Sequence, residues 1–249
     1  MQYYLGFSAP SYICTMSAAV AMATIAAVVI WTMRMLVVSI LSRPPLKPPR
    51  VLLVLGGSAD RERRAADLER CGLSQEEIAS LELVILSSGA LDEKDLRQAF
   101  IEERSTCSMR QRPLDVLADR SATCTVTNFT TLADEFSHSP GAKTIAVATS
   151  RLHCARASAV GSVVLGSRGV RIARMLAIDA RDEPQLRESL LRTVRDLLRA
   201  LLWATIGYDL SALGALIHPV RTADSKRWLQ QSTQARTQLR AALMALTPQ

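Results

Sequence analysis

The chain has 249 residues, of which 49% are hydrophobic, and it carries a net charge of +7. That length suits one globular domain of ordinary size with short extensions. Aromatic side chains make up only 4% of the chain and no recognition motif is present, so the composition argues against nucleic-acid binding. Arginine outnumbers lysine 26 to 4, which indicates a coding bias more than a phosphate-rich ligand.

The N-terminal part of the chain carries no acidic or basic side chain before Arg34. Within it, the run from Tyr12 to Met33 is long enough to cross a bilayer core of about 30 Å as a helix. A cleaved signal peptide is the alternative, but its apolar run would normally follow positive charge. Basic residues follow this run and none precedes it, so the positive-inside rule puts the rest of the chain in the cytoplasm, or in the stroma of a plastid. We therefore expect a single-pass membrane protein with its anchor in residues 1–41.

A proline-rich linker is expected over residues 42–49. Four of these eight residues are prolines, which stop a helix and favour extended geometry. The five cysteines of the chain are scattered and form no C-x-x-C pair, so the sequence indicates neither a disulfide framework nor a metal site. A reducing compartment fits them best.

Short apolar runs alternate with helical patterns from residue 50 onward. The run at 50–55 ends at two glycines and is typical of a strand buried on both faces. The pattern predicts strands at 50–55, 81–86, 144–148 and 170–178. It predicts helices at 60–71, 92–103, 125–136 and 152–165, and another from residue 190. This alternation predicts an α/β domain over residues 50–207, with a mostly parallel sheet and helices on both sides.

The predicted helix from residue 190 is strongly amphipathic, because its leucines form one stripe and its three arginines lie off it. We expect the stripe to pack on the sheet or on lipid. Residues 200–218 carry a single charge, Asp209, and we favour a packed or interfacial element there over a second span. Residues 208–249 are expected to form a C-terminal helical tail.

Polar residues follow the first two predicted strands. Gly57 lets its backbone amide approach a ligand closely, the start of the next helix attracts anions, and Arg61 can grip a phosphate or carboxylate. Ser88 and Gly89 occupy the corresponding place after the second strand. An ordinary strand-to-helix turn with solvated arginines explains the first cluster equally well.

A second polar cluster precedes the predicted helix at 125–136. Thr125 or Thr127 can cap that helix, which leaves Asn128 in its first turn with an amide that can both donate and accept. Helix capping alone explains this cluster almost as well as ligand binding does.

The third cluster, Thr149 to Ala157, follows the strand at 144–148, in the place where open α/β sheets bind ligands. Ser150 is a candidate N-cap, and His153 and Arg156 share one face at the positive end of the helix. We expect an anionic ligand there. His153 is a candidate for proton transfer, and a purely structural histidine is the alternative.

In this order the three clusters resemble the YdcF-like family, which includes SanA and ElyC and whose function is largely unknown. The resemblance runs from about Val51 to Gly207 and is closest to membrane-anchored members typical of cyanobacteria and plastids. The residues that carry it are Gly56-Gly57 with Arg61-Glu62 and Ala65-Ala66, Ser87-Ser88-Gly89, Thr125 to Phe129, Thr149-Ser150 with His153 and Arg156-Ala157, Leu165 to Gly169, and Arg195-Asp196 with Arg199-Ala200 and Trp203.

The resemblance implies a Rossmann-like three-layer domain with a pocket at the carboxyl ends of its strands. Family members are associated with envelope integrity and cell-wall precursor metabolism. Where relatives commonly place an aspartate or asparagine before the threonine, this chain has Cys124, so any activity that depends on that side chain is altered or absent here. The pocket residues carried over to this chain are Gly57, Arg61, Ser88, Gly89, Thr125, Asn128, Ser150, His153 and Arg156.

The sequence therefore predicts a membrane-anchored protein that binds a small anionic ligand, nucleotide-like or phosphorylated, in envelope or membrane precursor metabolism. If the protein is an enzyme, the glycine amides and two arginines hold the anion, Asn128 orients it and His153 moves a proton. The competing hypothesis is a non-catalytic ligand-sensing or scaffold protein. The sequence names no cofactor and no protein partner.

Overall fold

The computed structural model describes residues 47–87, 91, 93–105, 114–179, 189–207 and 236–246, with residues 93 and 102–105 described by their backbone alone. The expected membrane span over residues 12–33 lies outside these ranges, as do residues 42–46 of the linker and 208–235 of the tail. Within the described ranges, no helix combines the length and the apolar character that crossing a membrane requires.

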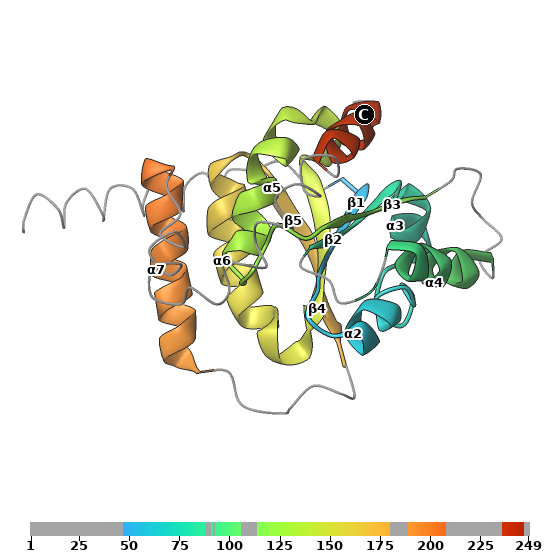
Figure 1. The fold of residues 1–249 in the computed structure, drawn as a ribbon, viewed down its shortest axis with the longest axis horizontal. Coiled ribbons are helices and arrows are strands. Elements are labelled where there is room, and N and C mark those ends of the chain that lie inside the picture. Colours follow the sequence, from blue (N-terminus) through green and yellow to red (C-terminus); the bar gives the residue numbers. More distant parts are fainter. Residues whose placement is uncertain are drawn as a thin grey trace, which may run out of the picture. The chain divides into compact units, whose positions relative to one another are not determined.

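Five parallel strands form one sheet (Figure 1). They are β1 (Val51–Leu55), β2 (Leu83–Ser87), β3 (Asp115–Asp119), β4 (Thr144–Ser150) and β5 (Arg171–Ile178). Their order across the sheet is β3-β2-β1-β4-β5, and each pair of neighbours is parallel. This order is typical of Rossmann-like sheets, and the predicted α/β class is confirmed.

Helices cover both faces of the sheet in Figure 1. One face carries α2 (Ala59–Arg64), α3 (Gln75–Ser80) and α4 (Glu93–Ser105), and the other carries α5 (Thr127–His138) and α6 (Cys154–Ser167). The short 3₁₀ turns η1 (Pro140–Ala142) and η2 (Arg151–His153) flank β4. The last labelled helix, α7 (Leu190–Ile206), lies against the outer side of α6.

The core is built around β1, whose five apolar residues are all buried. On one face, Leu52 and Val54 belong to a cluster that includes Phe100 of α4. On the other face, Phe129 of α5 is fully buried against α6. Gly161 of α6 permits this close approach, because a Cβ atom there would lie 2.8 Å from the ring of Phe129.

The chain leaves β1 and β4 toward opposite faces of the sheet. β1 leads to α2 on one face, whereas β4 leads through η2 to α6 on the other, although the two strands are neighbours. In open α/β sheets, ligands bind outside the carboxyl ends of the strands at such a point. We call this place the switch point, and the side of the sheet where the strands end the carboxyl edge.

The sequence prediction differs from the structure at three places. The helix expected over 60–71 ends at Arg64, because the chain then turns tightly and places Leu68 in the core. The sequence also missed α3 and β3. The strand β3 lies at the edge of the sheet, and its apolar residues stand between two aspartates, so it has no continuous apolar pattern.

The apolar stripe of α7 does not pack on the sheet, which corrects one of the two expectations for it. The buried residues of α7 are Asp196, Ala200 and Trp203, on the side that faces α6. Most of its leucines point away from the domain and are exposed.

Candidate functional site

The loop after β1 is held by a buried carboxylate. Gly57 adopts a φ of 140°, which favours glycine, and its N–H donates to Oε1 of Glu62 at 3.0 Å. The other oxygen of Glu62 accepts from the N–H of Leu91 at 2.7 Å. Glu62 is fully buried, so one carboxylate joins the loop after β1 to the segment after β2. The amide of Gly57, which was expected to meet an anion, is therefore already engaged by the protein.

Arg61 is buried beneath the same loop, with only 6% of its surface exposed. Its Nη1 donates to the carbonyl oxygens of Leu55 and Gly56, both at 3.1 Å. The alternative of a solvated arginine is therefore wrong for Arg61. Its guanidinium places a positive charge at the carboxyl edge and also fixes the exit of β1.

A buried hydrogen bond joins the end of β2 to the start of α5. The hydroxyl of Ser87 donates to Oδ1 of Asn128 at 3.1 Å, and both side chains are buried. Asn128 lies in the first turn of α5, as predicted. Ser88 and Gly89 lie outside the described residues.

The loop before α5 is ordered by Thr127. Its hydroxyl accepts from the N–H groups of Thr123 and Cys124, both at 2.8 Å. The N-cap residue of α5 is Val126, without a side-chain hydrogen bond, so the predicted capping by Thr125 or Thr127 is wrong. Thr127 holds the loop that precedes the helix instead, and Thr125 is half-buried.

Ser150 ends β4 at the switch point with a buried and unsatisfied hydroxyl. The residue is only 3% exposed, and none of the residues that the structure describes forms a hydrogen bond with its Oγ. It precedes η2, but its side chain does not cap that turn, and the N-cap residue of α6 is His153. The expectation that the Ser150 side chain caps the helix is therefore wrong.

The position of Ser150 follows from the strand register. Ala148 pairs with Val54 of β1, so Ser150 lies two residues further on, where β1 gives way to the glycine loop. Side chains alternate along a strand, so Ser150 shares a face with Ala146 and Ala148, which pack into the core cluster on the α2 side.

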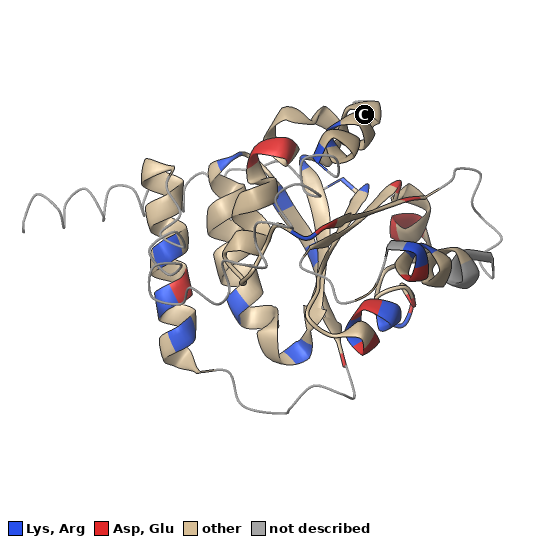
Figure 2. Cartoon of the chain, viewed as in Figure 1, with Lys and Arg blue, Asp and Glu red and all other residues tan. Residues whose placement is uncertain are grey.

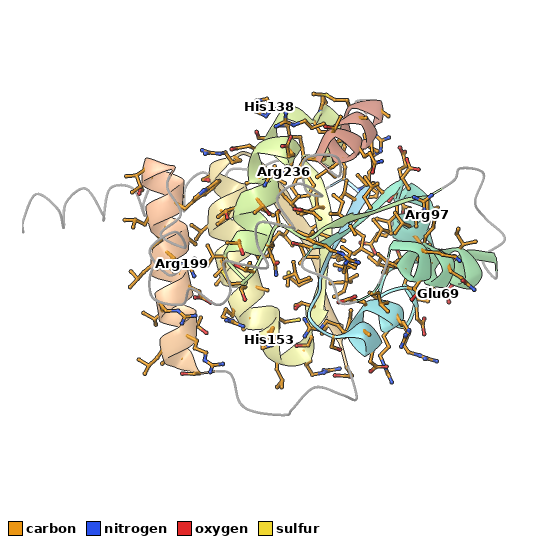
Figure 3. The ribbon with its side chains drawn as sticks, viewed as in Figure 1. Glu69, Arg97, His138, His153, Arg199 and Arg236 are labelled. Carbon is orange, nitrogen blue, oxygen red and sulfur yellow. The ribbon has the colours of Figure 1, made fainter. Side chains whose placement is uncertain are left out.

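His153 and Arg156 lie together, as their spacing predicts. Nδ1 of His153 is 3.4 Å from Nη2 of Arg156, and His153 is half-buried at the start of α6 (Figure 3). Arg156 also donates through Nη1 to Oδ2 of Asp196 on α7, at 2.9 Å. Arg156 thus joins the start of α6 to a carboxylate that the sequence analysis did not assign to the site.

Asp196 gathers arginines from two helices. Its Oδ1 accepts from Nη2 of Arg195 at 2.8 Å and lies 4.0 Å from Nη1 of Arg199. Nη1 of Arg199 is also 3.6 Å from Sγ of Cys124, in the loop before α5. With Arg156, three guanidinium groups surround one buried carboxylate and leave the cluster positively charged. Its sequence signal was a lone acid in a helix of leucines and arginines.

The structure thus brings the predicted residues to the carboxyl edge in three groups rather than one. The first is Arg61 with Gly57 and Glu62, the second is Asn128 with Ser87, and the third is His153 with Arg156 and Asp196. Within the described ranges, no three His, Cys, Asp or Glu side chains gather as a metal-binding group would.

A pocket of about 300 Å³ lies elsewhere, where a helix at 236–245 meets the end of α5. Its lining includes His138 and Ser139, which precede β4 and therefore lie at the opposite edge of the sheet from the switch point. Figure 3 shows His138 and His153 at opposite ends of the domain.

Comparison with known proteins gives no match: no family model, no curated protein and no solved structure is significantly similar to the chain. The candidate site therefore stands on its own geometry.

Proposed function

We propose that this chain is a membrane-anchored protein of the YdcF-like type, and that its α/β domain binds a small anionic ligand at the switch point. The ligand class is nucleotide-like or phosphorylated, and the role lies in envelope or membrane precursor metabolism. The family assignment is supported by the ordered resemblance in the sequence. The membrane anchor and the cytoplasmic or stromal side of the domain are supported by the charge-free run at 12–33 and by the basic residues that follow it.

The observation that carries the ligand proposal is the hydroxyl of Ser150. A buried hydroxyl without a hydrogen bond costs a fold about 1–3 kcal/mol, so native proteins rarely keep one without a reason. This one lies where parallel sheets bind ligands, and only the short turn η2 separates it from the start of α6, whose backbone dipole favours negative charge. A ligand oxygen at this place would satisfy it.

Charge supports an anion over a neutral ligand. Arg61 and Arg156 lie on opposite sides of the switch point, one after β1 and the other after β4. Glu62 accepts from a backbone N–H group, and Asp196 accepts from arginine side chains. Because several arginines surround the single charge of Asp196, that cluster keeps an excess of positive charge. Fixed positive charge beside a helix start is the usual setting for phosphate recognition.

A binding role without catalysis is the second candidate, and one observation favours it. Asn128 binds Ser87 and His153 contacts Arg156, so the two residues expected to act on one ligand belong to different hydrogen-bonded groups. The catalytic version requires both to reach the same ligand from these positions. The ligand-sensing version requires only that the ligand reach the start of α6.

The test of the ligand proposal is Ser150→Ala in the full chain, purified in detergent and melted with and without inorganic pyrophosphate or adenosine monophosphate. Because Ser150 Oγ has no hydrogen-bond partner among the described residues, the variant loses no hydrogen bond and no longer buries an unsatisfied hydroxyl, so without ligand it should melt at or above the wild-type temperature. The wild type should be stabilised by about 2.7 kcal/mol at a hundredfold excess over Kd. The variant should lose most of that stabilisation.

Ser139→Ala is the matched control, because the Ser139 hydroxyl is also buried but donates to the carbonyl of Leu243 at 2.7 Å. Without ligand, the free energy of unfolding of this control should be lower by about 1–3 kcal/mol, and its stabilisation by ligand should be unchanged. If no phosphate compound stabilises the wild type, or if Ser150→Ala responds fully, the ligand proposal is wrong.

The second experiment separates enzyme from sensor. Whichever anion stabilises the wild type is incubated with wild type and with His153→Gln, and the anion is then analysed for chemical change. If the wild type converts the anion and the variant binds it without converting it, catalysis by His153 is supported. An anion recovered unchanged from the wild type supports the sensing role.

A further inference from the structure

The outer face of α7 carries a continuous apolar surface, which we call the leucine stripe. Its members have exposed fractions between 38% and 81% and are Leu190, Leu191, Val194, Leu198, Leu202 and Ile206. Five of them follow one another at four-residue steps, so they line one side of the helix over about 24 Å. A large exposed apolar patch on a water-soluble surface marks an interaction site.

The stripe is not what holds α7 on the domain. That contact uses the other side of the helix, where Asp196 binds Arg156 of α6 and Trp203 stacks on Arg168 at 4.6 Å. These contacts hold α7 without the leucine stripe, whose side chains are left for a partner outside the described fold.

The charges of α7 fit an anionic lipid surface. Asp196 is the one acid in the helix, and it is buried among arginines. Arg192 and Arg195 are exposed along one side of the stripe, and Figure 2 shows the positive residues of α7 in the part of the helix that holds Asp196, toward its N-terminal end. An interfacial helix places its apolar side chains below the lipid headgroups and its arginines at the phosphates.

The sequence supplies a reason why weak lipid affinity would suffice. The apolar run at 12–33 is expected to anchor the chain, and the sixteen residues from 34 to 49 could span about 50 Å if extended. A tether of that length keeps the domain near the bilayer at high effective concentration.

We propose that α7 lies on the surface of an anionic bilayer through the leucine stripe, with Arg192 and Arg195 at the lipid phosphates. The leucine stripe lies on the exposed side of α7, away from the buried Asp196, so the proposal does not depend on which ligand the domain binds.

The test uses the full chain in vesicles of phosphatidylcholine and the anionic lipid phosphatidylglycerol, with part of the lipid carrying a nitroxide quencher. Leu198→Trp places a fluorophore in the stripe, and the fluorescence that it adds to the wild type is measured. Lipid-borne nitroxide should quench this added fluorescence, and acrylamide in the water should quench it poorly.

Ile101→Trp is the matched control, because Ile101 is 56% exposed on α4, on the opposite face of the sheet. Its added fluorescence should be quenched by acrylamide and not by the lipid nitroxide. Changing both arginines, Arg192→Gln and Arg195→Gln, in the Leu198→Trp chain should lower the affinity for the vesicles about twenty-five-fold, since each basic residue near an anionic leaflet contributes about fivefold. Vesicles of phosphatidylcholine alone, which carry no net charge, should lower the affinity of the Leu198→Trp chain to a similar extent.

Two results would overturn the proposal. Quenching of the Leu198→Trp signal by acrylamide alone would mean that the stripe faces water. Protection from both quenchers would mean that protein covers it, either another part of this chain or a second copy.

Discussion

Two buried carboxylates organise the carboxyl edge of the sheet. Glu62 binds the N–H groups of Gly57 and Leu91, and Asp196 binds arginines from α6 and α7. Each carboxylate is paired with several donors, which offsets the cost of burying its charge. The arginines that the sequence offers as ligands of an anion are thus partly neutralised within the protein, whereas the hydroxyl of Ser150 has no hydrogen-bond partner among the described residues.

Cys71 offers a prediction at the scale of a single residue. Burial, reinforced by the nearby charge of Asp67, raises the pKa of its thiol from 9.0 to about 11. Only the thiolate reacts with alkylating reagents, so alkylation of Cys71 at pH 8 should be about a hundredfold slower in the folded chain than in the unfolded chain. Mass spectrometry of the alkylated peptides measures both rates, and equal rates would contradict the assigned burial.

Among the helices, α3 shows how a short element is held in place. It has six residues, too few for stability alone, and its capping box joins Ser74 and Glu77. Glu77 also accepts from Nε of Arg174 on β5 at 2.6 Å, a contact between residues 97 positions apart. One carboxylate therefore caps the helix and ties it to a distant strand.

Glu77→Gln tests this double role through its pH dependence. Burial alone would raise the pKa of Glu77, but hydrogen bonds from Arg174 and Ser74 lower it below its ordinary value of 4.5. A carboxyl whose pKa is lowered by folding stabilises the fold above that ordinary value, and this contribution disappears as the pH falls through the folded pKa. At pH 7 the variant should therefore be less stable, by about 1 kcal/mol.

Melting curves of wild type and Glu77→Gln at pH 7 and well below pH 4 provide the measurement. The difference between the two proteins should shrink in acid. A difference that stays constant with pH would show that the ionised form of Glu77 contributes nothing.

The strands and helices that the sequence predicted are those whose pattern reflects their own burial. β1 and β4 are continuous apolar runs, because helices cover both of their faces. α2, α3 and β3 were misjudged because their form depends on contacts far along the chain, such as the packing of Leu68 and the pairing of β3 with β2. Periodicity in the sequence does not record such contacts.

The candidate site was predicted in part for the same reason. The placement of polar residues after β1 and β4 identified the correct edge of the sheet, since parallel strands all end there. Glu62, Ser87 and Asp196 were not assigned to it, because an acid beside arginines is usually solvated and a serine at a strand end is common. Their roles arise only when α4, α5 and α7 are packed in place.

At the scale of the whole domain, the two edges of the sheet are built differently. The carboxyl edge holds the switch point and its charged groups. The opposite edge is closed by the helix at 236–245, where Ser139 donates to the carbonyl of Leu243 and Arg240 pairs with Glu135. Leu239, Leu243 and Leu246 are buried in this contact, so the end of the chain contributes to the core.

Gly141→Ala tests that closure. A Cβ atom at Gly141 would lie within 2.4 Å of Cβ of Leu246, so the helix at 236–245 would have to move. The variant should be less stable by about 1–3 kcal/mol, and hydrogen exchange should rise in the helix while the amides of β1 and β4 stay protected.

Met244→Ala is the comparison, because Met244 is 62% exposed on the same helix, so the change removes little packing, causes no steric conflict and should change exchange little. Unchanged exchange in Gly141→Ala would show that the helix does not rest on Gly141.

The contacts of Asp196 with Arg156 and Arg199 limit how α7 can move. The carboxylate of Asp196 in the middle of α7 contacts Arg156 at the beginning of α6. It also contacts Arg199, which reaches Cys124 in the loop before α5. α7 cannot slide or rotate by a helical turn without breaking contacts at both of the other helices. A displacement of α7 would therefore act on the start of α6 through the ion pair of Asp196 with Arg156.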